Sequence, residues 1–381
     1  MLNRIMRFII RFLNIIIPKN RHFFYFKTTF IYPDNIDAVL DELLIDSCDN
    51  SNMYFYDTPV FRYKGQKNVI WLKTKSSSFW HFLRSKYVFV DNGFFKETKP
   101  VKRQTIVNLW HGVSFKKIGF YNKKERAYPT ATYVVTYSSF FKKIMSNAFG
   151  VEENNVLTTG ETRNDYLFKP IDEKIKSVLG LTGYRKIIMW MPTYRQSRFD
   201  NLSDGINYPF GFPFLVEGNL PVLNDYCSKN GILLILKWHG LQRLPESTSS
   251  NNLKNLKFLT SEELSRFNVP LNSLLSHCDA LITDYSSVFI NYMLLKRPIC
   301  FAFDDLEYYE KHRGFMFENI DKYMPGFHAH SFEKVLDFID SVAENSYKYN
   351  ISNETRAFFN EHEDGCNSKR LLAFLGLVDE N

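Results

Sequence analysis

Apolar runs and helical spacings alternate along most of the chain and predict strands and helices in turn. The clearest unit spans residues 131–150, where the apolar run ATYVVTY is followed by serines, an amphipathic stretch and Gly150. This is the order of a strand, a helix N-cap, a helix and a C-cap glycine. Repeated alternation of this kind predicts parallel sheets covered by helices on both faces.

Two such series lie on either side of a hinge-like segment, residues 168–184, and predict two α/β domains, residues 21–170 and residues 171–381, the second ending in helices. The other predicted strands are residues 22–30, 52–63, 67–74, 87–93, 103–110, 154–160, 185–191, 232–238, 280–285 and 298–303. The other predicted helices are residues 34–47, 76–85, 219–230, 271–278 and 286–297.

Residues 1–20 have a different pattern, because Arg4, Arg7, Arg11 and Asn14 recur at helical spacing and leave isoleucines, phenylalanine and leucine on the other face. The apolar runs are far shorter than the ~18 residues that cross a bilayer, and a small-residue cleavage site is absent. We therefore expect a basic amphipathic helix lying on an anionic membrane surface. The alternative is a leader helix that packs on its own protein.

Composition narrows the class of protein. The 381 residues are 45% hydrophobic and 23% charged, which is typical of a globular protein. The net charge of +7 is concentrated before the first acid, Asp34, so the rest of the chain is nearly neutral. This argues against a nucleic-acid-binding surface. The five cysteines include no CxxC pair and indicate reduced thiols in a cytoplasmic protein.

Polar residues follow several predicted strands, in the segments LWHGVSFKKIG, TGETRND, MPTYR, KWHG and TDYSS. Parallel sheets bind ligands at the carboxyl ends of their strands. Ser286 and Ser287 lie where a helix begins, and we expect them to bind a phosphate with its N-terminal amides. The alternative is that they and Asp284 only cap that helix.

Two arginines are further candidates. Arg195 follows Thr193 in MPTYR and could pair with phosphate oxygens through its forked guanidinium; the alternative is a surface salt bridge. Arg163, near the domain boundary, could serve either a ligand or a domain contact.

Two histidines are the candidates for proton transfer. His111 follows TIVNLW and precedes Gly112, and His239 follows ILLILKW and precedes Gly240. Histidine accepts protons near neutral pH, and one candidate falls in each predicted domain. The alternative for each is a hydrogen-bonded structural residue. The motifs HExxH, GxxxxGK[ST] and GxSxG are absent.

Taken together, WHGVSFKKIG, TGETRND, MPTYR, KWHG and LITDYSSVF, followed by RGFMFE and MPG, resemble the CDP-glycerol glycerophosphotransferase family in order and spacing. This family comprises primases and polymerases of teichoic acids and related capsule polymers. The likeness implies a GT-B fold, with two Rossmann-like domains facing across a cleft, the first binding the acceptor and the second the nucleotide donor. It also implies monotopic attachment to the cytoplasmic face of the cell membrane, as the basic start suggests.

The resemblance further implies roles for individual residues. His111 becomes the general base, and His239 contacts the donor phosphates or protonates the leaving group. The residues expected to bind substrate are Gly112, Arg163, Thr193, Arg195, Thr283, Asp284, Ser286 and Ser287. Gly240 stands where the family usually has proline, and the chain lacks the long N-terminal domain of the large polymerases, so it looks more like a primase or a compact capsule transferase.

The implied reaction transfers glycerol phosphate from CDP-glycerol to a hydroxyl of a lipid-linked or capsule polymer acceptor and releases CMP. No cofactor is predicted, although a divalent metal ion stays open. The close alternatives are a CDP-ribitol donor or a GT-B nucleotide-sugar glycosyltransferase, and a more distant one is a non-catalytic membrane adaptor.

Overall fold

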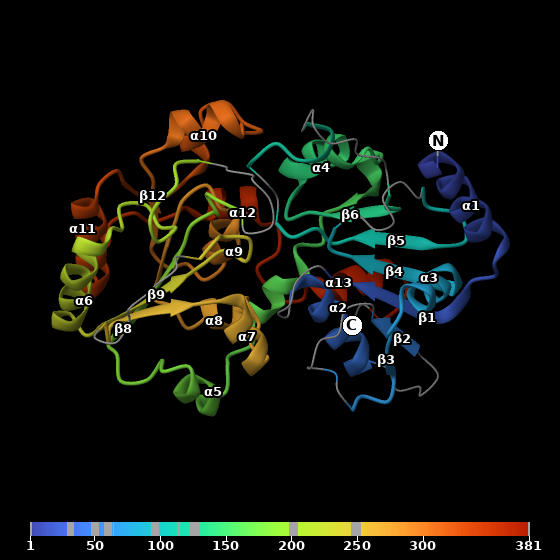
Figure 1. Ribbon diagram of the computed structural model, residues 1–381, viewed down its shortest axis with the longest axis horizontal. Coiled ribbons are helices and arrows are strands. Elements are labelled where there is room, and N and C mark those ends of the chain that lie inside the picture. The colour runs from blue at the N-terminus through green and yellow to red at the C-terminus, as the bar shows by residue number, and fades with distance from the viewer. Residues whose placement is uncertain are drawn as a thin grey trace. The chain divides into compact units, whose positions relative to one another are not determined.

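The computed structural model describes residues 2–28, 34–46, 53–56, 63, 65–92, 99–112, 115–121, 130–197, 205–244 and 253–379 (Figure 1). The chain divides into two units, each built around its own sheet. Unit 1 comprises Met1–Val113, Ile118–Phe168 and Ala357–Asn381, and unit 2 comprises Ser114–Lys117 and Lys169–Arg356.

The sheet of unit 1 is parallel, with strand order β3-β2-β1-β4-β5-β6-β7. Its strands are β1 (Asn20–Lys27), β2 (Met53–Tyr56), β3 (Val69–Trp71), β4 (Ser85–Val90), β5 (Thr105–Asn108), β6 (Tyr133–Val135) and β7 (Val156–Leu157). The order reverses between β1 and β4, so the ends of these two strands form the switch point at which such sheets bind ligands.

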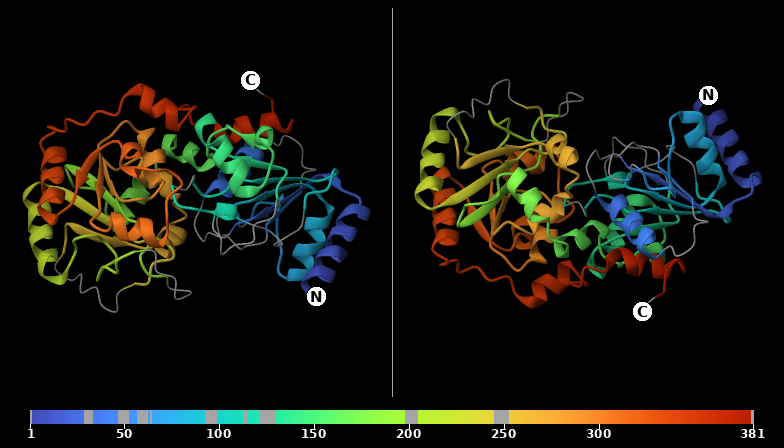
Figure 2. Two further views of the ribbon diagram at one scale, coloured as in Figure 1. Left: turned by 90° about the horizontal axis from the view of Figure 1, so that it is seen from above. Right: turned by 90° about the horizontal axis from the view of Figure 1, so that it is seen from below.

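Helices cover both faces of this sheet (Figure 2). They are α1 (Leu2–Ile16), α2 (Asn35–Asp46), α3 (Lys75–Arg84), α4 (Lys142–Phe149) and α13 (Asn367–Phe374). Side chains alternate along a strand, so Phe24 and Phe26 join the core beneath α2 and α13, whereas Tyr25 contacts Phe82 of α3. Gly150 ends α4 with a φ of 65°.

The sheet of unit 2 repeats this plan, with parallel order β10-β9-β8-β11-β12-β13 and a switch point between β8 and β11. Its strands are β8 (Lys186–Met191), β9 (Ile232–Lys237), β10 (Leu256–Leu259), β11 (Ala280–Thr283), β12 (Ile299–Ala302) and β13 (Phe327–Ala329). Its helices are α5 (Glu173–Val178), α6 (Leu220–Lys229), α7 (Ser261–Phe267), α8 (Leu271–Leu275), α9 (Val288–Met293), α10 (Leu306–His312) and α11 (Phe332–Ala343).

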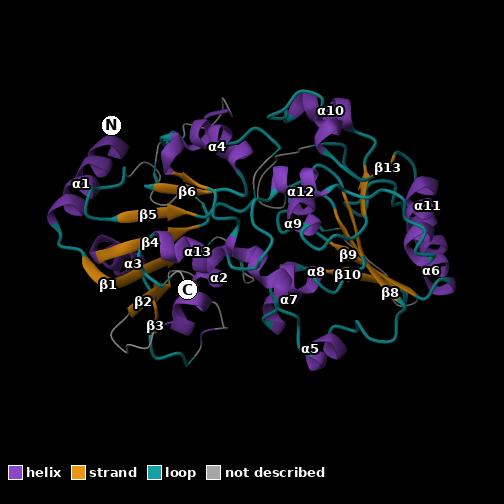
Figure 3. Cartoon of the chain, turned by 180° about the vertical axis from the view of Figure 1, so that it is seen from behind, coloured by secondary structure: helices purple, strands orange, loops and turns teal. Residues whose placement is uncertain are grey.

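Helices α6 and α11 lie side by side on one face of this sheet (Figures 1 and 3), and Tyr226 donates a hydrogen bond to Asp340 between them. Both helices contribute buried side chains to the core that contains Ile188 and Trp190 of β8. The predicted parallel α/β architecture is therefore confirmed, whereas the GT-B cleft stays a prediction.

The C-terminal segment does not follow the sequence-based division, which assigned all of residues 171–381 to one domain. From Ala357 onward, within α12 (Asn353–Phe359), the chain belongs to unit 1. Leu371 and Leu372 of α13 are buried in the core of that unit. The backbone amides of Asn367 and Ser368 donate to Asp165, each at 2.8 Å. Core packing and this carboxylate cap together hold the tail on the first sheet.

Helix α1 lies alongside α3 (Figure 2). Asn14, which the pattern assigned to the polar face with the arginines, is fully buried and donates to Gln104. Among the side chains of α1 that the structure describes, residues 8–16, the large exposed apolar ones are Phe8, Ile9, Phe12, Ile15 and Ile16. Of the helices in the described part of the chain, none is long and apolar enough to span a membrane.

Candidate active site

The turn after β5 holds His111 in one orientation. Its neighbours Trp110 and Gly112 both have positive φ, 54° and 113°. Glycine adopts such angles readily, whereas Trp110 is strained, and backbone strain of this kind concentrates at functional sites. The Nδ1 atom of His111 lies 3.0 Å from the backbone carbonyl oxygen of Asp91. A carbonyl oxygen can only accept, so Nδ1 carries the proton and Nε2 carries the lone pair. The tautomer is the one in which Nε2 can accept a proton.

The surroundings of His111 also set its charge. Burial lowers the pKa of His111 to about 4; the hydrogen bond to Asp91 opposes this effect and the positive charge of Arg163 adds to it. The imidazole is therefore neutral at pH 7. A neutral ring is the form that a general base requires.

Arg163 lies in the same unit and braces this turn. Its guanidinium pairs with Asp34 at 3.2 Å and with Glu161 at 3.0 Å, and it donates to the backbone carbonyl of His111 at 3.2 Å. Glu161 also accepts a hydrogen bond from Tyr137. Because two buried carboxylates share its charge, Arg163 acts here as a brace for the His111 turn. The predicted ligand contact of Arg163 stays a prediction.

Sequence reasoning missed several residues of this cluster. Asp91 follows β4, and its side chain accepts from Thr28, which follows β1, at 2.5 Å. Asn35 donates to the carbonyl of Trp110 at 3.0 Å and to Glu161 at 3.1 Å. The polar ends of these strands were visible in the sequence. Their meeting depends on β1 and β4 being neighbours, which no local pattern reveals.

In unit 2, Thr193 and Asp284 meet at the switch point. They follow β8 and β11, which are adjacent strands. The amide and hydroxyl of Thr193 donate to the two oxygens of Asp284 at 2.9 and 3.0 Å, and Thr283 donates to the carbonyl of Met191 at 2.7 Å. Asp284 thus orients Thr193 and does not cap a helix.

Arg195 is completely buried, so the alternative of a surface salt bridge is wrong. It pairs with Asp284 at 2.7 Å and with Asp305 at 2.9 Å. Burial opposes its charge, but the two carboxylates outweigh this effect and raise the pKa of Arg195. The rings of Tyr208, Tyr285 and Tyr309 surround the guanidinium. Two carboxylates occupy the fork that a phosphate would need, so Arg195 organises the strand ends.

Ser286 and Ser287 are half-buried beside this cluster. The helix that follows is shorter than predicted, α9 starting at Val288 and Lys296 adopting a φ of 56° beyond its end. Ser287 has helical backbone angles, and its side chain makes no capping hydrogen bond. Capping therefore does not account for Ser287.

His239 lies beyond the end of β9 and is exposed. Its Nδ1 accepts from the amide of Leu241 at 3.1 Å, so the neutral ring carries its proton on Nε2. The ring centroid is 5.2 Å from that of Tyr194, which follows Thr193. A Cβ atom added at Gly240 would lie 3.6 Å from the Ser261 hydroxyl, which is an ordinary contact distance.

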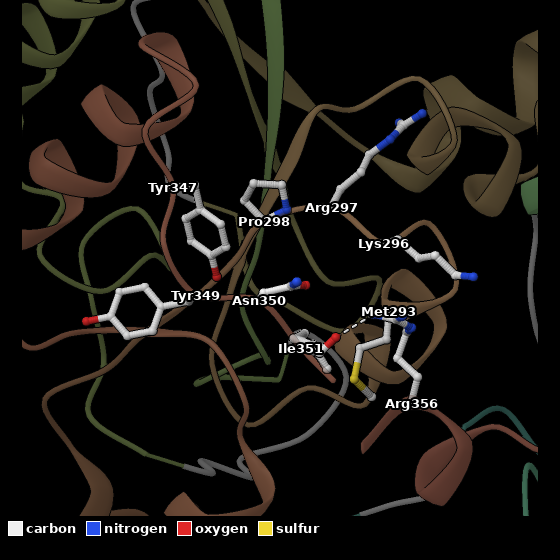
Figure 4. A pocket seen from close by; sticks show the side chains of 9 residues that line it. All are labelled: Met293, Lys296, Arg297, Pro298, Tyr347, Tyr349, Asn350, Ile351 and Arg356. Atoms are coloured by element: carbon white, nitrogen blue, oxygen red, sulfur yellow. Dashed lines mark hydrogen bonds between the residues drawn. The ribbon is translucent and has the colours of Figure 1, made fainter. Parts of the chain in front are cut away.

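A pocket of about 210 Å³ lies elsewhere in unit 2, where Lys296 and Arg297 precede β12 (Figure 4). Both side chains point away from Tyr347 and Asn350 at its centre (Figure 4). Arg297 donates to the carbonyls of Ser276 and Cys278. This pocket is at the opposite edge of the sheet from Thr193 and Asp284, and its cations do not converge.

The described residues contain no group of three histidine, cysteine, aspartate or glutamate side chains arranged to hold a metal ion.

The comparison with protein-family models shows the family of the chain. The family described as CDP-glycerol:poly(glycerophosphate) glycerophosphotransferase matches residues 9–376. A teichoic acid poly(glycerol phosphate) polymerase of Bacillus spizizenii is 28% identical over 91% of this chain and 86% of its own length. The teichoic acid ribitol-phosphate polymerase TarL of Staphylococcus aureus is 28% identical over 76% of this chain, which spans about half (51%) of that relative.

The fold is similar to that of a solved structure. The structure of the wall teichoic acid polymerase TagF superposes with a TM-score of 0.74 at 19% identity, over 98% of this chain and 92% of that one. The family match covers nearly the whole chain, including all five strand-end motifs. The chain therefore belongs to the CDP-glycerol:poly(glycerophosphate) glycerophosphotransferase family.

Proposed function

We propose that the protein transfers glycerol phosphate from CDP-glycerol to a hydroxyl of a teichoic acid-like or capsule polymer acceptor and releases CMP. The observation that carries this proposal is the state of His111. The ring is neutral, and its Nδ1 donates to the Asp91 carbonyl, which leaves the lone pair on Nε2. The chain also belongs to a glycerophosphotransferase family. Unit 1 binds the acceptor and unit 2 the donor.

In the proposed step, an acceptor hydroxyl oxygen attacks the phosphorus that carries the glycerol. A new oxygen–phosphorus bond forms as the bond to the bridging oxygen of the diphosphate breaks, and CMP leaves with that electron pair. His111 Nε2 takes the acceptor's proton and later returns it to water. Phosphoryl transfer depends mainly on positioning and electrostatics, so the reaction needs no covalent enzyme intermediate and one well-placed general base is sufficient.

The donor phosphates bind at the ends of β8 and β11. Ser286, Ser287 and the backbone around Thr283 donate hydrogen bonds to phosphate oxygens, and Asp284 keeps Thr193 oriented. His239 Nε2–H donates to the phosphates, because the Leu241 amide already engages Nδ1. Arg195 holds Asp284 in place through their ion pair and makes no direct phosphate contact in this scheme.

A CDP-ribitol donor is the second candidate, since a ribitol-phosphate polymerase is among the relatives. Incubation with CDP-glycerol, CDP-ribitol and a nucleotide sugar, each with a lipid-linked acceptor, separates the alternatives. We expect CMP and a product extended by one glycerol phosphate from the first donor. Faster CMP release from CDP-ribitol would reassign the donor, and release of a nucleoside diphosphate would make the protein a glycosyltransferase. A protein that is inert with every donor is the non-catalytic adaptor.

The site of action in this proposal is the cytoplasmic face of the cell membrane. Phe8, Phe12 and Ile15 are exposed by 72%, 52% and 53%, so α1 turns apolar side chains toward solvent. A groove of about 650 Å³ at its C-terminal end is lined by Lys19, Arg21, Arg84 and Trp80. Apolar side chains flanked by cations and tryptophan are the chemistry that binds an anionic membrane surface.

A further inference from the structure

The segment that follows the His111 turn belongs to the other unit. Ser114–Lys117 is part of unit 2, although the chain on both sides of it is part of unit 1. Within unit 2, Phe115 is buried, and its ring centroid lies 5.3 Å from that of Phe289 and 5.4 Å from that of Phe317. The aromatic packing anchors the segment to this unit.

Backbone bonds fix its register. Lys116 forms an antiparallel bridge with Phe315. The amide of Met316 donates to the carbonyl of Phe115 at 2.7 Å, and the amide of Lys117 donates to the carbonyl of Gly314 at 3.2 Å. Side chains alternate along such a segment, so Lys116 faces away from the core that holds Phe115.

The ammonium of Lys116 lies beside the candidate donor residues of unit 2. It is 5.9 Å from the ring centroid of Tyr194 and 5.6 Å from that of Tyr309. Tyr194 follows Thr193 in the chain and lies against His239, with 5.2 Å between the ring centroids. Cation–π contacts of this length hold an ammonium over aromatic faces. The side chain is thereby kept near Thr193 and His239.

The charge balance of this region calls for such a cation. The donor carries a diphosphate, and the buried guanidinium of Arg195 is already offset by Asp284 and Asp305. Lys237 is also engaged, because its buried ammonium donates to the Trp238 carbonyl at 2.7 Å and to Ser261 at 3.1 Å. Lys116, whose ammonium lies over the rings of Tyr194 and Tyr309, brings a further positive charge close to these strand ends.

We propose that Lys116 binds the diphosphate of the donor nucleotide in unit 2. One short segment then supplies the general base to one unit and a phosphate-binding cation to the other, separated by only four residues. The inference rests on the proposed function, because it takes a CDP-alditol as the ligand.

The test compares Lys116→Met with Lys117→Met, which removes the neighbouring, exposed lysine of the same segment. Binding of CDP-glycerol, CDP-ribitol and cytidine to the full-length proteins is measured by calorimetry at two salt concentrations. A hydrogen bond to a charged group is lost, so Lys116→Met should bind both CDP-alditols about 10- to 100-fold more weakly and with a smaller salt dependence. Cytidine has no phosphate and should bind equally well to both variants.

The other variants and ligands give results that either support or overturn the role of Lys116. Lys116→Arg should recover most of the affinity, and Lys117→Met should bind like the wild type. Equal affinity of Lys116→Met and wild type for the CDP-alditols would overturn the inference while leaving the proposed function in place. Parallel loss of cytidine binding would make Lys116 a packing residue. A wild-type protein that binds neither CDP-alditol would instead remove the proposed function, and the inference with it.

Discussion

His111 is the residue whose removal should affect turnover most. Its Nδ1 is engaged by the Asp91 carbonyl, which leaves Nε2 as the atom that can accept the acceptor's proton. His111→Ala should lower kcat by about 100-fold or more, because general bases contribute roughly this factor. The affinity for CDP-glycerol should change little. Steady-state CMP release and donor binding measure the two effects, and near-normal turnover would show that the base lies elsewhere.

The depressed pKa of His111 predicts an unusual pH profile. The base works only when neutral, and its pKa is lowered to about 4, so kcat/KM should stay level as pH falls through 6.5. The acid limb should appear only as pH approaches 4. Activity assays with a parallel unfolding measurement separate titration from acid denaturation. A limb centred near 6.5 in folded protein would mean that His111 is more exposed to solvent than this geometry implies.

Arg195 is expected to govern stability more than donor affinity. Arg195→Met leaves the buried carboxylates of Asp284 and Asp305 without their shared cation. Removing one partner of a buried ion pair costs about 3–5 kcal/mol of unfolding free energy. Lys334→Met breaks an exposed pair with Asp337 and should leave the unfolding curve unchanged. Urea unfolding of both variants provides the comparison, and equal curves would contradict the proposed role of Arg195.

At the scale of elements, α1 offers the sharpest test of membrane binding. Phe12 and Ile15 are about half exposed, and neither is needed for the inward contact that Asn14 makes with Gln104. A Phe12→Ser and Ile15→Ser double variant should sediment poorly with anionic vesicles, because interfacial binding scales with apolar area buried. Val222→Ser changes an exposed apolar residue on α6 and serves as control. Unchanged sedimentation of the double variant would make α1 an ordinary surface helix.

The elements themselves were largely predictable, and the failures are instructive. Strand β8 was expected at residues 185–191 and runs from Lys186 to Met191. The helix expected at residues 286–297 shrinks to Val288–Met293, since Lys296 takes a left-handed conformation. Edge strands β10 and β13 were not predicted, because short strands at a sheet margin carry little local periodicity.

At the scale of the whole molecule, the returning tail should stabilise unit 1. Leu371 is completely buried in the core of that unit, more than 200 residues beyond Phe168. Leu371→Ala should therefore destabilise unit 1 by about 2–5 kcal/mol, as core truncations do. Phe374→Ala, at an exposed position of the same helix, should have a far smaller effect. Hydrogen exchange of peptides from each unit measures the loss of stability. A loss of protection confined to the peptides of unit 2 would contradict the prediction.

The sequence by itself determined the parallel α/β class, the strand-end positions of His111, Thr193 and Asp284, and the family. These properties follow from local periodicity and from short motifs, both of which can be identified without knowing which residues are in contact. Only the tertiary structure decided which strand ends meet. It buried Arg195 between Asp284 and Asp305, set His111 against Asp91, carried Lys116 into unit 2 and returned the tail to unit 1. Strand order and burial arise from packing between distant segments, which leaves no local signature in the chain.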